Sequence, residues 1–431
     1  MKIFNKSEAK IVLIIFVMAV IFRILVPLVN ETIYSKKSFI AFGKNFNQKY
    51  LNDDIWYSFS AKSIMEGHGL AINPKEIRDN LGYEINKTEK YPDMFINNGK
   101  DYYRHKAIPP IYPIFIAILY KLFGINTLAF YVPQILIGAF SCVLLFYIAK
   151  EVFNQKVAAG AGLFMAFYPE LANWTYHIRV ETLFIFLILL IFYLLSAGKS
   201  TEGSWSAILF GIILALTCLT RLTFLFFVPI LFVWKYITAE GDKNNAIKWI
   251  AVVSLTFGAC LLPWAIRNYI VFHNFTVLTE EAGTIFMDYP KSKEYSSVMS
   301  FSLAKESYAK IYLSYILHNP IEFVASSLNR ILLFLGPITI HMDHLAKIFK
   351  GTVWLLVFPV AYGGIIYSII KGNKKTYLLI LFIVYYILFH GLTFVDDGLV
   401  YRYPILPFIC IFSAYGYFAG MGRINDQRCD K

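Results

Sequence analysis

The stretch HIRVETLFIFLILL, residues 177–190, sets ionisable side chains directly before an unbroken apolar run. After Glu181 no charged residue follows until Lys199, a length that crosses the hydrocarbon core of a bilayer as a helix. Charged groups at the edge of such a run are costly, so they are usually functional or paired with one another. The stretch therefore predicts a transmembrane helix headed by functional ions, with an Arg179–Glu181 structural pair as the alternative.

The composition extends this prediction to the whole chain. Of its 431 residues, 58% are hydrophobic, 18% aromatic and 16% charged, and the mean hydropathy is +0.56. A soluble domain of this length cannot bury so much apolar surface, so the bilayer must be the solvent for most of it. Basic cytoplasmic loops explain the net charge of +12, and we expect no nucleic acid as a partner.

The sequence predicts an all-α integral membrane protein with about ten transmembrane helices. Apolar runs long enough to span fall at 10–29, 128–149, 156–171, 180–197, 204–220, 221–237, 247–265, 352–371, 376–395 and 400–420. With the N-terminus in the cytoplasm, each cytoplasmic loop is basic, as the positive-inside rule demands. The first run has a basic start and no small-residue cleavage site, so we expect an uncleaved signal-anchor helix and both termini in the cytoplasm.

Two further apolar stretches, 108–124 and 322–340, must stay out of the count to preserve this topology. A Pro pair opens the first, and Asn329 and Arg330 interrupt the second. Both are typical of helices that lie in or near the outer interface. The chain is then one membrane domain, 1–431, with two large extracytoplasmic loops at 30–107 and 266–350.

A pair of carboxylates opens the stretch YLNDDIWYSFSAKSIMEGHGL, residues 50–70, where the first outer loop returns to the bilayer. Asp53 and Tyr57 are four residues apart and share one helix face. The helix dipole favours the ionised form of a carboxylate at the helix start. Asp53 is therefore a candidate catalytic group, with Asp54 beside it. An N-cap that merely starts a surface helix is the structural alternative.

Arginines occupy the outer ends of several predicted helices, where the positive-inside rule predicts few basic residues. Arg221, Arg267 and Arg402 each lie in apolar sequence at such an end. A guanidinium is always charged and donates two parallel hydrogen bonds to phosphate. We predict an outer-leaflet phosphate site, for which interfacial snorkelling of each side chain is the alternative. Its candidate ligands are Arg104, Lys106, Arg179, Arg221, Arg267 and Arg402.

No residue spacing is typical of a metal site. The five cysteines lie in apolar runs or the C-terminal tail, so we expect neither a disulfide nor a zinc site. His105, His177 and the Asp396–Asp397 pair are the nearest metal-ligand candidates, each more readily a loop residue. We predict no metal ligand and no definite cofactor, although a divalent metal stays possible.

Six motifs resemble, in the same order, those of the GT-C superfamily of polytopic membrane glycosyltransferases. They are DDIWYSFSAKSIMEGHGL, AIPPIYPIFIAILYKLFG, RVETLF, LTRLTFLFFVP, PWAIRN and RYPILPF. The resemblance covers most of the chain and is nearest to the protein O-mannosyltransferase-like and lipid A aminoarabinose transferase-like branch. One departure concerns the aminoarabinose branch, which has a basic residue directly before the Pro pair. This sequence has Ile108 there, and Arg104 or Lys106 is the candidate substitute.

The resemblance implies an enzyme that moves a monosaccharide from a polyprenyl-phosphate carrier to an acceptor hydroxyl on the outer face of the membrane. Asp53 corresponds to the catalytic Asp and Glu181 to the second acid, while Tyr57 and Tyr403 are predicted to contact substrate. Single displacement with inversion needs a carboxylate base and cations at the departing phosphate. Expected partners are the lipid-linked donor, membrane lipids and an acceptor protein, glycolipid or cell-wall glycan; the expected location is a bacterial inner membrane.

The main alternative is a transporter or flippase for polyprenyl-linked glycans or lipids. A transporter predicts ionisable residues or broken helices near mid-membrane and repeated halves. Neither is apparent in the sequence. A polymerase or ligase that uses a diphosphate-linked oligosaccharide is closer in class, and a structural membrane scaffold is the simplest alternative.

Overall fold

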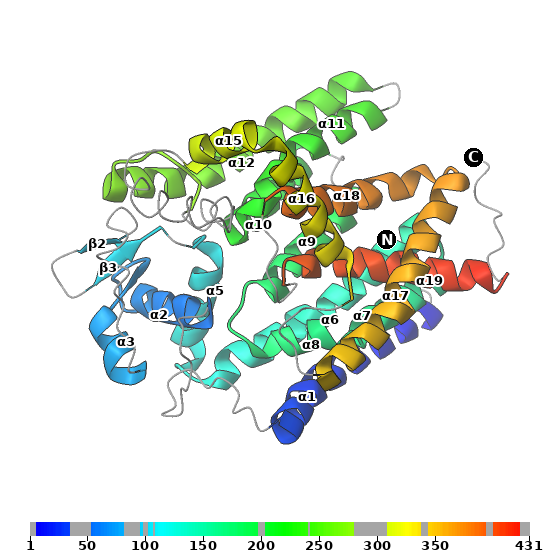
Figure 1. The fold of residues 1–431 in the computed structure, drawn as a ribbon, viewed down its shortest axis with the longest axis horizontal. Coiled ribbons are helices and arrows are strands. Elements are labelled where there is room, and N and C mark those ends of the chain that lie inside the picture. Colours follow the sequence, from blue (N-terminus) through cyan, green and yellow to red (C-terminus); the bar gives the residue numbers. More distant parts are fainter. Residues whose placement is uncertain are drawn as a thin grey trace.

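The computed structural model describes residues 6–34, 53–81, 95–97, 102–106, 108–196, 203–239, 242–279, 308–337, 344–393 and 400–422. Helices dominate this part of the chain (Figure 1). Six helical segments in it are long and apolar enough to cross a bilayer: Lys6–Val26, Thr127–Val152, Lys243–Phe272, Lys350–Ile370, Lys374–Leu392 and Val400–Gly420. The predicted all-α integral membrane fold is confirmed, and the protein is a multi-pass membrane protein. The total number of spans stays a prediction.

The apolar runs found in the sequence coincide with helices. Most form one main helix: α1 (Lys6–Tyr34), α6 (Thr127–Val152), α9 (Glu181–Ser196), α10 (Ser204–Thr220), α12 (Lys243–Phe272), α17 (His344–Ile370), α18 (Tyr377–Leu392) after the 3₁₀ turn η4 (Lys374–Thr376), and α19 (Leu406–Gly420) after η5 (Val400–Ile405). The run 156–171 is broken, because α7 (Gln155–Ala166) ends and Pro169 starts α8 (Pro169–Asn173). The run 221–237 begins as the 3₁₀ helix η3 (Leu222–Phe227) and continues as α11 (Val228–Thr238).

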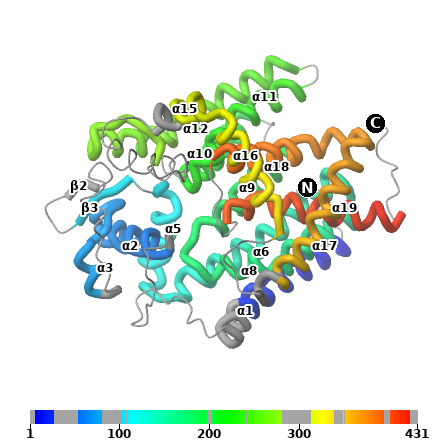
Figure 2. Tube along the Cα trace, in the orientation of Figure 1, coloured from blue at the N-terminus to red at the C-terminus, as the bar shows by residue number. Residues whose placement is uncertain are grey.

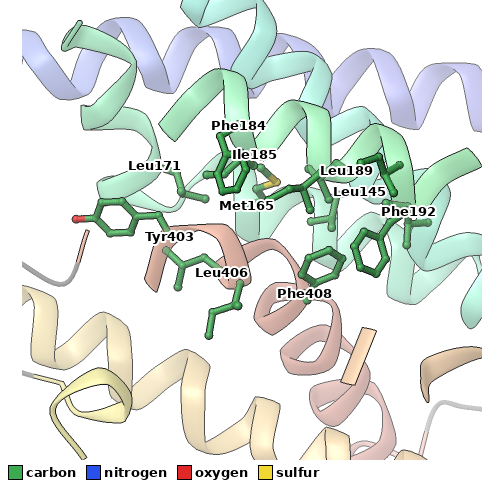
Figure 3. Packing of buried hydrophobic residues seen from close by; sticks show 14 of the residues in the cluster. Leu145, Met165, Leu171, Phe184, Ile185, Leu189, Phe192, Tyr403, Leu406 and Phe408 are labelled. Atoms are coloured by element: carbon green, nitrogen blue, oxygen red, sulfur yellow. The ribbon is translucent and has the colours of Figure 1, made fainter. Parts of the chain in front are cut away.

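The centre of the bundle lies where α6, α7, α9 and α19 pack together. Figure 3 shows side chains from these helices interdigitating, among them Leu145, Met165, Phe184 and Phe408, all of which are fully buried. Close packing of this kind, rather than a hydrophobic force, holds helices together in lipid. This core supports the start of α9, which carries Glu181, and the start of α19, which follows directly on η5 with Arg402 and Tyr403.

Two glycines let α17 and α19 approach closely. A Cβ on Gly364 would lie 2.2 Å from the carbonyl oxygen of Phe412, and one on Gly416 would lie 2.5 Å from that of Val360. Small residues at such crossings allow helix backbones to touch within a bilayer. The crossing fixes α19, and with it η5, which carries Arg402.

A small unit beside the bundle contains the paired carboxylates. It consists of α2 (Asp53–Met65), β1 (Ala71–Ile72), α3 (Pro74–Leu81), β2 (Phe95–Asn97) and β3 (Tyr103–His105). It lies at one end of the molecule, away from α17 and α19 (Figures 1 and 2). The strands are antiparallel in the order β1-β3-β2, with Ala71 opposite Arg104. Gly67 and Gly69, with φ of 85° and 75°, turn the chain from α2 towards β1 because glycine adopts positive φ without strain.

The two apolar stretches that we kept out of the span count form α5 (Ile111–Phe123) and α16 (Pro320–Leu335); α15 (Tyr308–His318) precedes α16. The 13 residues of α5 extend about 20 Å, less than the roughly 30 Å of a hydrocarbon core. α16 packs against α18 and exposes Ile321, Val324, Leu328 and Leu332, which recur every three or four residues. Both helices are typical of the membrane interface, and their placement there stays a prediction.

Candidate active site

Asp54 lies on the buried side of α2, with 2% of its surface exposed. Its Oδ2 is 3.7 Å from Arg179 Nε, and its Oδ1 is 3.9 Å from His177 Nδ1. The side chain of Asp53, the first residue of α2, lies outside the described part of the chain. The catalytic role predicted for Asp53 therefore stays a prediction, while its neighbour is placed among charged partners.

The helix α2 is fixed by its packing along α5. Tyr57, one turn after Asp53, is buried and meets the ring of Tyr112 edge-on, with the ring centroids 4.8 Å apart. The Tyr112 hydroxyl donates a hydrogen bond of 3.1 Å to Oε1 of Gln134 on α6. The start of α2 is therefore tied through two tyrosines to the membrane-spanning helix α6.

Gln134 also holds the segment between α8 and α9. Its Nε2 donates to the backbone carbonyls of Thr175, at 3.3 Å, and His177, at 2.9 Å. Trp174 begins this segment in the 3₁₀ turn η2 (Trp174–Tyr176), and its ring lies 4.8 Å below the guanidinium of Arg179. Backbone hydrogen bonds and a cation–π contact thus place Arg179 opposite Asp54.

Glu181 is the first residue of α9 and is 2% exposed. Its Oε1 accepts a hydrogen bond of 3.3 Å from Nη1 of Arg221, and its Oε2 has no hydrogen-bond partner among the described residues. Arg221 lies at the break between α10 and η3, with its guanidinium 4.6 Å over the ring of Tyr401. These ion pairs join segments that are far apart in the sequence, whereas the structural alternative drawn from the sequence pairs Arg179 with Glu181.

We call the set Asp54, Arg179, Glu181 and Arg221 the carboxylate site. Tyr112 lies within electrostatic range of Asp54, Glu181 and Arg179. Burial lowers the pKa of His177 to about 4; Arg179 acts in the same direction and Glu181 opposes it. His177 is therefore neutral near pH 7. The two acids and two guanidinium groups of this site cancel in charge.

Arg267, near the C-terminal end of α12, lies among aromatic rings. Its guanidinium is 5.0 Å from the ring centroid of Trp264 and 5.1 Å from that of Phe272. Nη2 donates to the carbonyl oxygen of Leu70 at 3.0 Å, and Nη1 donates to Oδ1 of Asn268 at 3.0 Å. Both acceptors are neutral, so they satisfy hydrogen bonds of Arg267 and leave its charge in place.

Two further cations accompany Arg267. Lys106 is buried, with Nζ 5.2 Å from the centroid of the same Phe272 ring. Arg104 is exposed on β3 and within electrostatic range of Arg267. We call these three residues the basic cluster. Within the described part of the chain, no acid forms an ion pair with Arg104 or Arg267.

His105 connects the basic cluster to α2. Its ring is buried, with Nε2 2.9 Å from Oγ of Ser60 and the ring of Trp56 at 5.6 Å. Burial lowers the pKa of His105 to about 3, and Arg267 acts in the same direction. Ser60 follows Asp54 by six positions, or about 9 Å along a helix axis. One helix therefore borders both the carboxylate site and the basic cluster.

Arg402 belongs to neither group by its contacts. Its Nη1 donates to the carbonyl oxygens of Gly336, at 2.6 Å, and Phe334, at 3.4 Å, where α16 ends. Carbonyls at a helix C-terminus lack partners within the helix and favour cations. Arg402 therefore caps α16. The adjacent Tyr403 is 1% exposed and packs 5.7 Å from the ring of Trp174.

The predicted phosphate ligands thus fall into three groups: Arg179 and Arg221 with acids, Arg104, Lys106 and Arg267 together, and Arg402 on α16. The site also contains residues that we did not single out from the sequence. Gln134 had a signal, because an amide inside the apolar run 128–149 is costly without partners. Trp174 and Tyr401 had no sequence signal except that they lie close to Arg179 and Arg402 in the sequence.

The described residues include no group of three or more His, Cys, Asp or Glu side chains placed to hold a metal ion. His105 and His177 contact Ser60 and Asp54, respectively. The Asp396–Asp397 pair lies outside the described residues.

Comparison with known proteins gives one family match and a set of similar structures. The profile of the dolichyl-phosphate-mannose-protein mannosyltransferase family matches residues 107–266, less than half of the chain. A search of curated protein sequences finds no significant match. The matched range contains Glu181, Arg179 and Arg221, so it includes most of the carboxylate site.

Similar structures include several of an Archaeoglobus fulgidus oligosaccharyltransferase. The enzyme AglB in complex with an inhibitory peptide and a dolichol-phosphate is 13% identical, with a TM-score of 0.55 over 97% of this chain and 51% of its own. The apo form is 13% identical, with a TM-score of 0.59 over 99% of this chain and 52% of its own. A complex with Zn and sulfate is 14% identical, with a TM-score of 0.55 over 95% and 50%.

These findings confirm the predicted resemblance to GT-C superfamily membrane glycosyltransferases and do not favour the flippase alternative. The likeness to the oligosaccharyltransferase shows the fold, and this chain spans about half the length of those structures. One structure of the same fold was solved with Zn, which is compatible with a divalent metal in such proteins.

Proposed function

We propose that the protein is a glycosyltransferase that moves a monosaccharide from a polyprenyl-phosphate donor to an acceptor hydroxyl. The observation that supports this most directly is that α2 borders two sites of opposite chemistry. The carboxylate site at Asp54 suits a hydroxyl that must lose a proton. The basic cluster suits a phosphate, and it is connected to α2 by the hydrogen bond between Ser60 and His105. The mannosyltransferase profile over residues 107–266 supports the same class.

In the proposed reaction the acceptor oxygen attacks the anomeric carbon from the side opposite the phosphate. The bond between that carbon and the phosphate oxygen breaks, and the polyprenyl phosphate leaves with the electron pair. The proton of the acceptor hydroxyl passes to a carboxylate. One displacement inverts the anomeric configuration. Because phosphate is already a good leaving group, fixed cations near it suffice to stabilise its developing charge.

We assign the base to the Asp53–Asp54 pair, with Asp53 as the first choice. Asp54 contacts Arg179 and His177, which hold it in one orientation. Glu181 presents a buried Oε2 with no hydrogen-bond partner among the described residues, so it can accept a hydrogen bond from a sugar or acceptor hydroxyl. Tyr57 and Tyr403, whose rings pack on Tyr112 and Trp174, supply rigid walls for the substrate.

We place the reaction on the outer face of a bacterial inner membrane, with both termini in the cytoplasm. The basic loops of the sequence support this orientation. The neighbouring oligosaccharyltransferase was solved with dolichol-phosphate and an inhibitory peptide, which supports a polyprenyl-phosphate donor here. The acceptor is a protein, a glycolipid or a cell-wall glycan, bound with the help of the loops 30–107 and 266–350.

The first experiment is transfer by purified protein in detergent from a panel of radiolabelled lipid-linked sugars. The panel contains polyprenyl-phosphate monosaccharides and, as the competing class, diphosphate-linked oligosaccharides. Wild type is compared with Asp53→Asn, Asp54→Asn and Glu181→Gln, with folding followed by thermal unfolding. We expect turnover of one monophosphate donor, lost in Asp53→Asn. Turnover of only a diphosphate donor would identify an oligosaccharide ligase, and donor binding without turnover a transporter.

A further inference from the structure

A single side chain of α6 connects the helix that carries Asp54 with the segment that faces it. Gln134 is 1% exposed and lies inside the apolar run 128–149. A buried amide is costly in such surroundings unless it is hydrogen-bonded. This amide uses both of its ends, because Oε1 accepts from Tyr112 and Nε2 donates to the carbonyl oxygens of Thr175 and His177. Gln134 therefore joins three parts of the chain that lie far apart in the sequence.

The partners fix which way the amide points. Carbonyl oxygens only accept hydrogen bonds, so the NH₂ group of Gln134 must face Thr175 and His177. Oε1 then faces the Tyr112 hydroxyl. Burial raises the pKa of this hydroxyl and the charge of Asp54 acts in the same direction, so Tyr112 keeps its proton and donates it. Glutamine suits this position because glutamate would turn an acceptor towards two carbonyls, and an apolar side chain would make none of these bonds.

On one side the hydrogen bonds of Gln134 reach the helix that begins with the paired carboxylates. Tyr112 lies on α5, along which α2 packs, and its ring meets that of Tyr57 edge-on with the centroids 4.8 Å apart. Tyr57 follows Asp54 by three positions, about one helical turn. The position of α2 against α5 therefore sets the position of Asp54.

On the other side the hydrogen bonds hold the segment that leads into α9. Nδ1 of His177 lies 3.9 Å from Oδ1 of Asp54. Arg179, two residues later, approaches the same carboxylate to 3.7 Å, and Glu181 then begins α9. The chain between α8 and α9 is short, and its turn η2 spans three residues. The position of this segment relative to Asp54 therefore depends on the groups that hold its backbone.

We propose that Gln134 is a positioning residue for glycosyl transfer, which sets the distance between α2 and the segment that carries Arg179 and Glu181. This inference rests on the proposed function. The reacting groups of a displacement must be closely aligned, and a shift of about 1 Å caused by a residue outside the chemistry can lower the rate by about a hundredfold. Gln134 acts through Tyr112 and the backbone of residues 175–177. It therefore affects the rate at saturating substrate more than the donor KM.

The test compares transfer by wild type and by Gln134→Met, which keeps the length of the side chain without its hydrogen bonds. We expect kcat to fall by about ten- to a hundredfold and the donor KM to stay within about twofold of wild type. Ser141→Ala is the matched control, because Ser141 is also buried on α6 but donates to the carbonyl of Ile137 in the same helix. Its kcat should match that of wild type. Tyr112→Phe should also be slower, and the double variant no slower than Gln134→Met, since both break one connection.

Hydrogen exchange of the backbone amides in residues 174–181 tests the connection without a donor. Exchange should become about tenfold faster in Gln134→Met and stay at the wild-type rate in Ser141→Ala. The proposal is overturned if folded Gln134→Met keeps the wild-type kcat, or if its exchange in this segment is unchanged. Tyr112→Phe, which removes one hydrogen bond, serves for the kcat measurement if Gln134→Met does not fold. Faster exchange in Gln134→Met, with no donor turned over by wild type, would remove the proposed function and keep the connection.

Discussion

The carboxylate site and the basic cluster use the same side chain in opposite ways. In both, a guanidinium lies on aromatic rings: Arg221 on Tyr401, and Arg267 between Trp264 and Phe272. In the carboxylate site the guanidinium meets an acid, and its charge is cancelled. In the basic cluster Arg267 meets a carbonyl and an amide oxygen, and its charge is kept. The partner, rather than burial or stacking, decides whether the charge of each arginine is cancelled or kept.

The largest effect should come from removing an acid of the carboxylate site. Glu181→Gln is expected to lower the transfer rate by about 10²- to 10⁴-fold. It should also reduce the free energy of unfolding by about 3–5 kcal/mol, because Arg221 is left buried without its counter-charge. Transfer in single turnovers and thermal unfolding in detergent measure the two effects.

A double variant separates these two effects of Glu181→Gln. Glu181→Gln/Arg221→Gln carries no buried charge at this pair, so it should regain stability while staying inactive. Recovery of activity together with stability would mean that Glu181 only supports the fold, and it would remove the acid from the reaction.

The next effect concerns the charge of Arg267, which forms no ion pair with an acid among the described residues. Arg267→Gln should raise the donor KM by roughly ten- to a hundredfold, as expected when a hydrogen bond between charged groups is lost. The rate at saturating donor should change little, because the acids are untouched. Steady-state kinetics over a range of donor concentrations give this split.

Arg402→Gln provides the contrast to Arg267→Gln. Arg402 caps α16 through Gly336 and Phe334, so its loss should lower the unfolding temperature and leave the donor KM near that of wild type. An Arg402→Gln variant with a raised KM and unchanged stability would return this residue to the phosphate site.

These two regions also show which features of the fold and the site could be predicted from the sequence. The apolar helices could be predicted because a helix in lipid must satisfy its own backbone and carry an apolar surface, both of which hydropathy records. Even the break before α8 has a local signal in Pro169. The types of residue in the site could be predicted for the same reason, since an ionisable group such as Glu181 at the head of an apolar run is costly unless it functions or pairs.

The pairing of these residues could not be predicted. Arg221 is 40 positions from Glu181, and Arg179 is far from Asp54 in the sequence, whereas the sequence offered the nearer Arg179–Glu181 pair as the structural alternative. Which arginine meets which acid depends on how the helices cross, and no local pattern records that. The sequence therefore predicted one phosphate site from the six basic residues, although their contacts divide them into three groups.

A smaller effect is the pH dependence that His105, beside the basic cluster, gives to the free energy of unfolding. His105 is buried in its neutral form, with its pKa lowered to about 3 from 6.5. Between these values the unfolded chain binds more protons than the folded one, so the free energy of unfolding is unaffected above pH 6.5 and falls as the pH drops below it. The loss from His105 should reach about 1.4 kcal/mol at pH 5.5.

Thermal unfolding of wild type and His105→Gln, measured from pH 7.5 down to 5, checks this prediction. Gln can still hydrogen-bond Ser60 but binds no proton, so the variant should lose less stability on acidification. His318→Gln, at an exposed position, is the control. Equal slopes for wild type and His105→Gln would mean that protonation of His105 is not coupled to unfolding.

The smallest effect distinguishes the two arginines within the basic cluster. Arg104 is exposed and Arg267 is partly buried among rings, so salt should screen the first and spare the second. Arg104→Gln should raise the donor KM only about two- to fivefold at low ionic strength, as for other exposed charges. This increase should vanish at high salt, whereas that of Arg267→Gln should persist. If both increases vanish together, the basic cluster attracts the donor over a distance instead of contacting its phosphate, and the cluster differs from the carboxylate site in range as well as in sign.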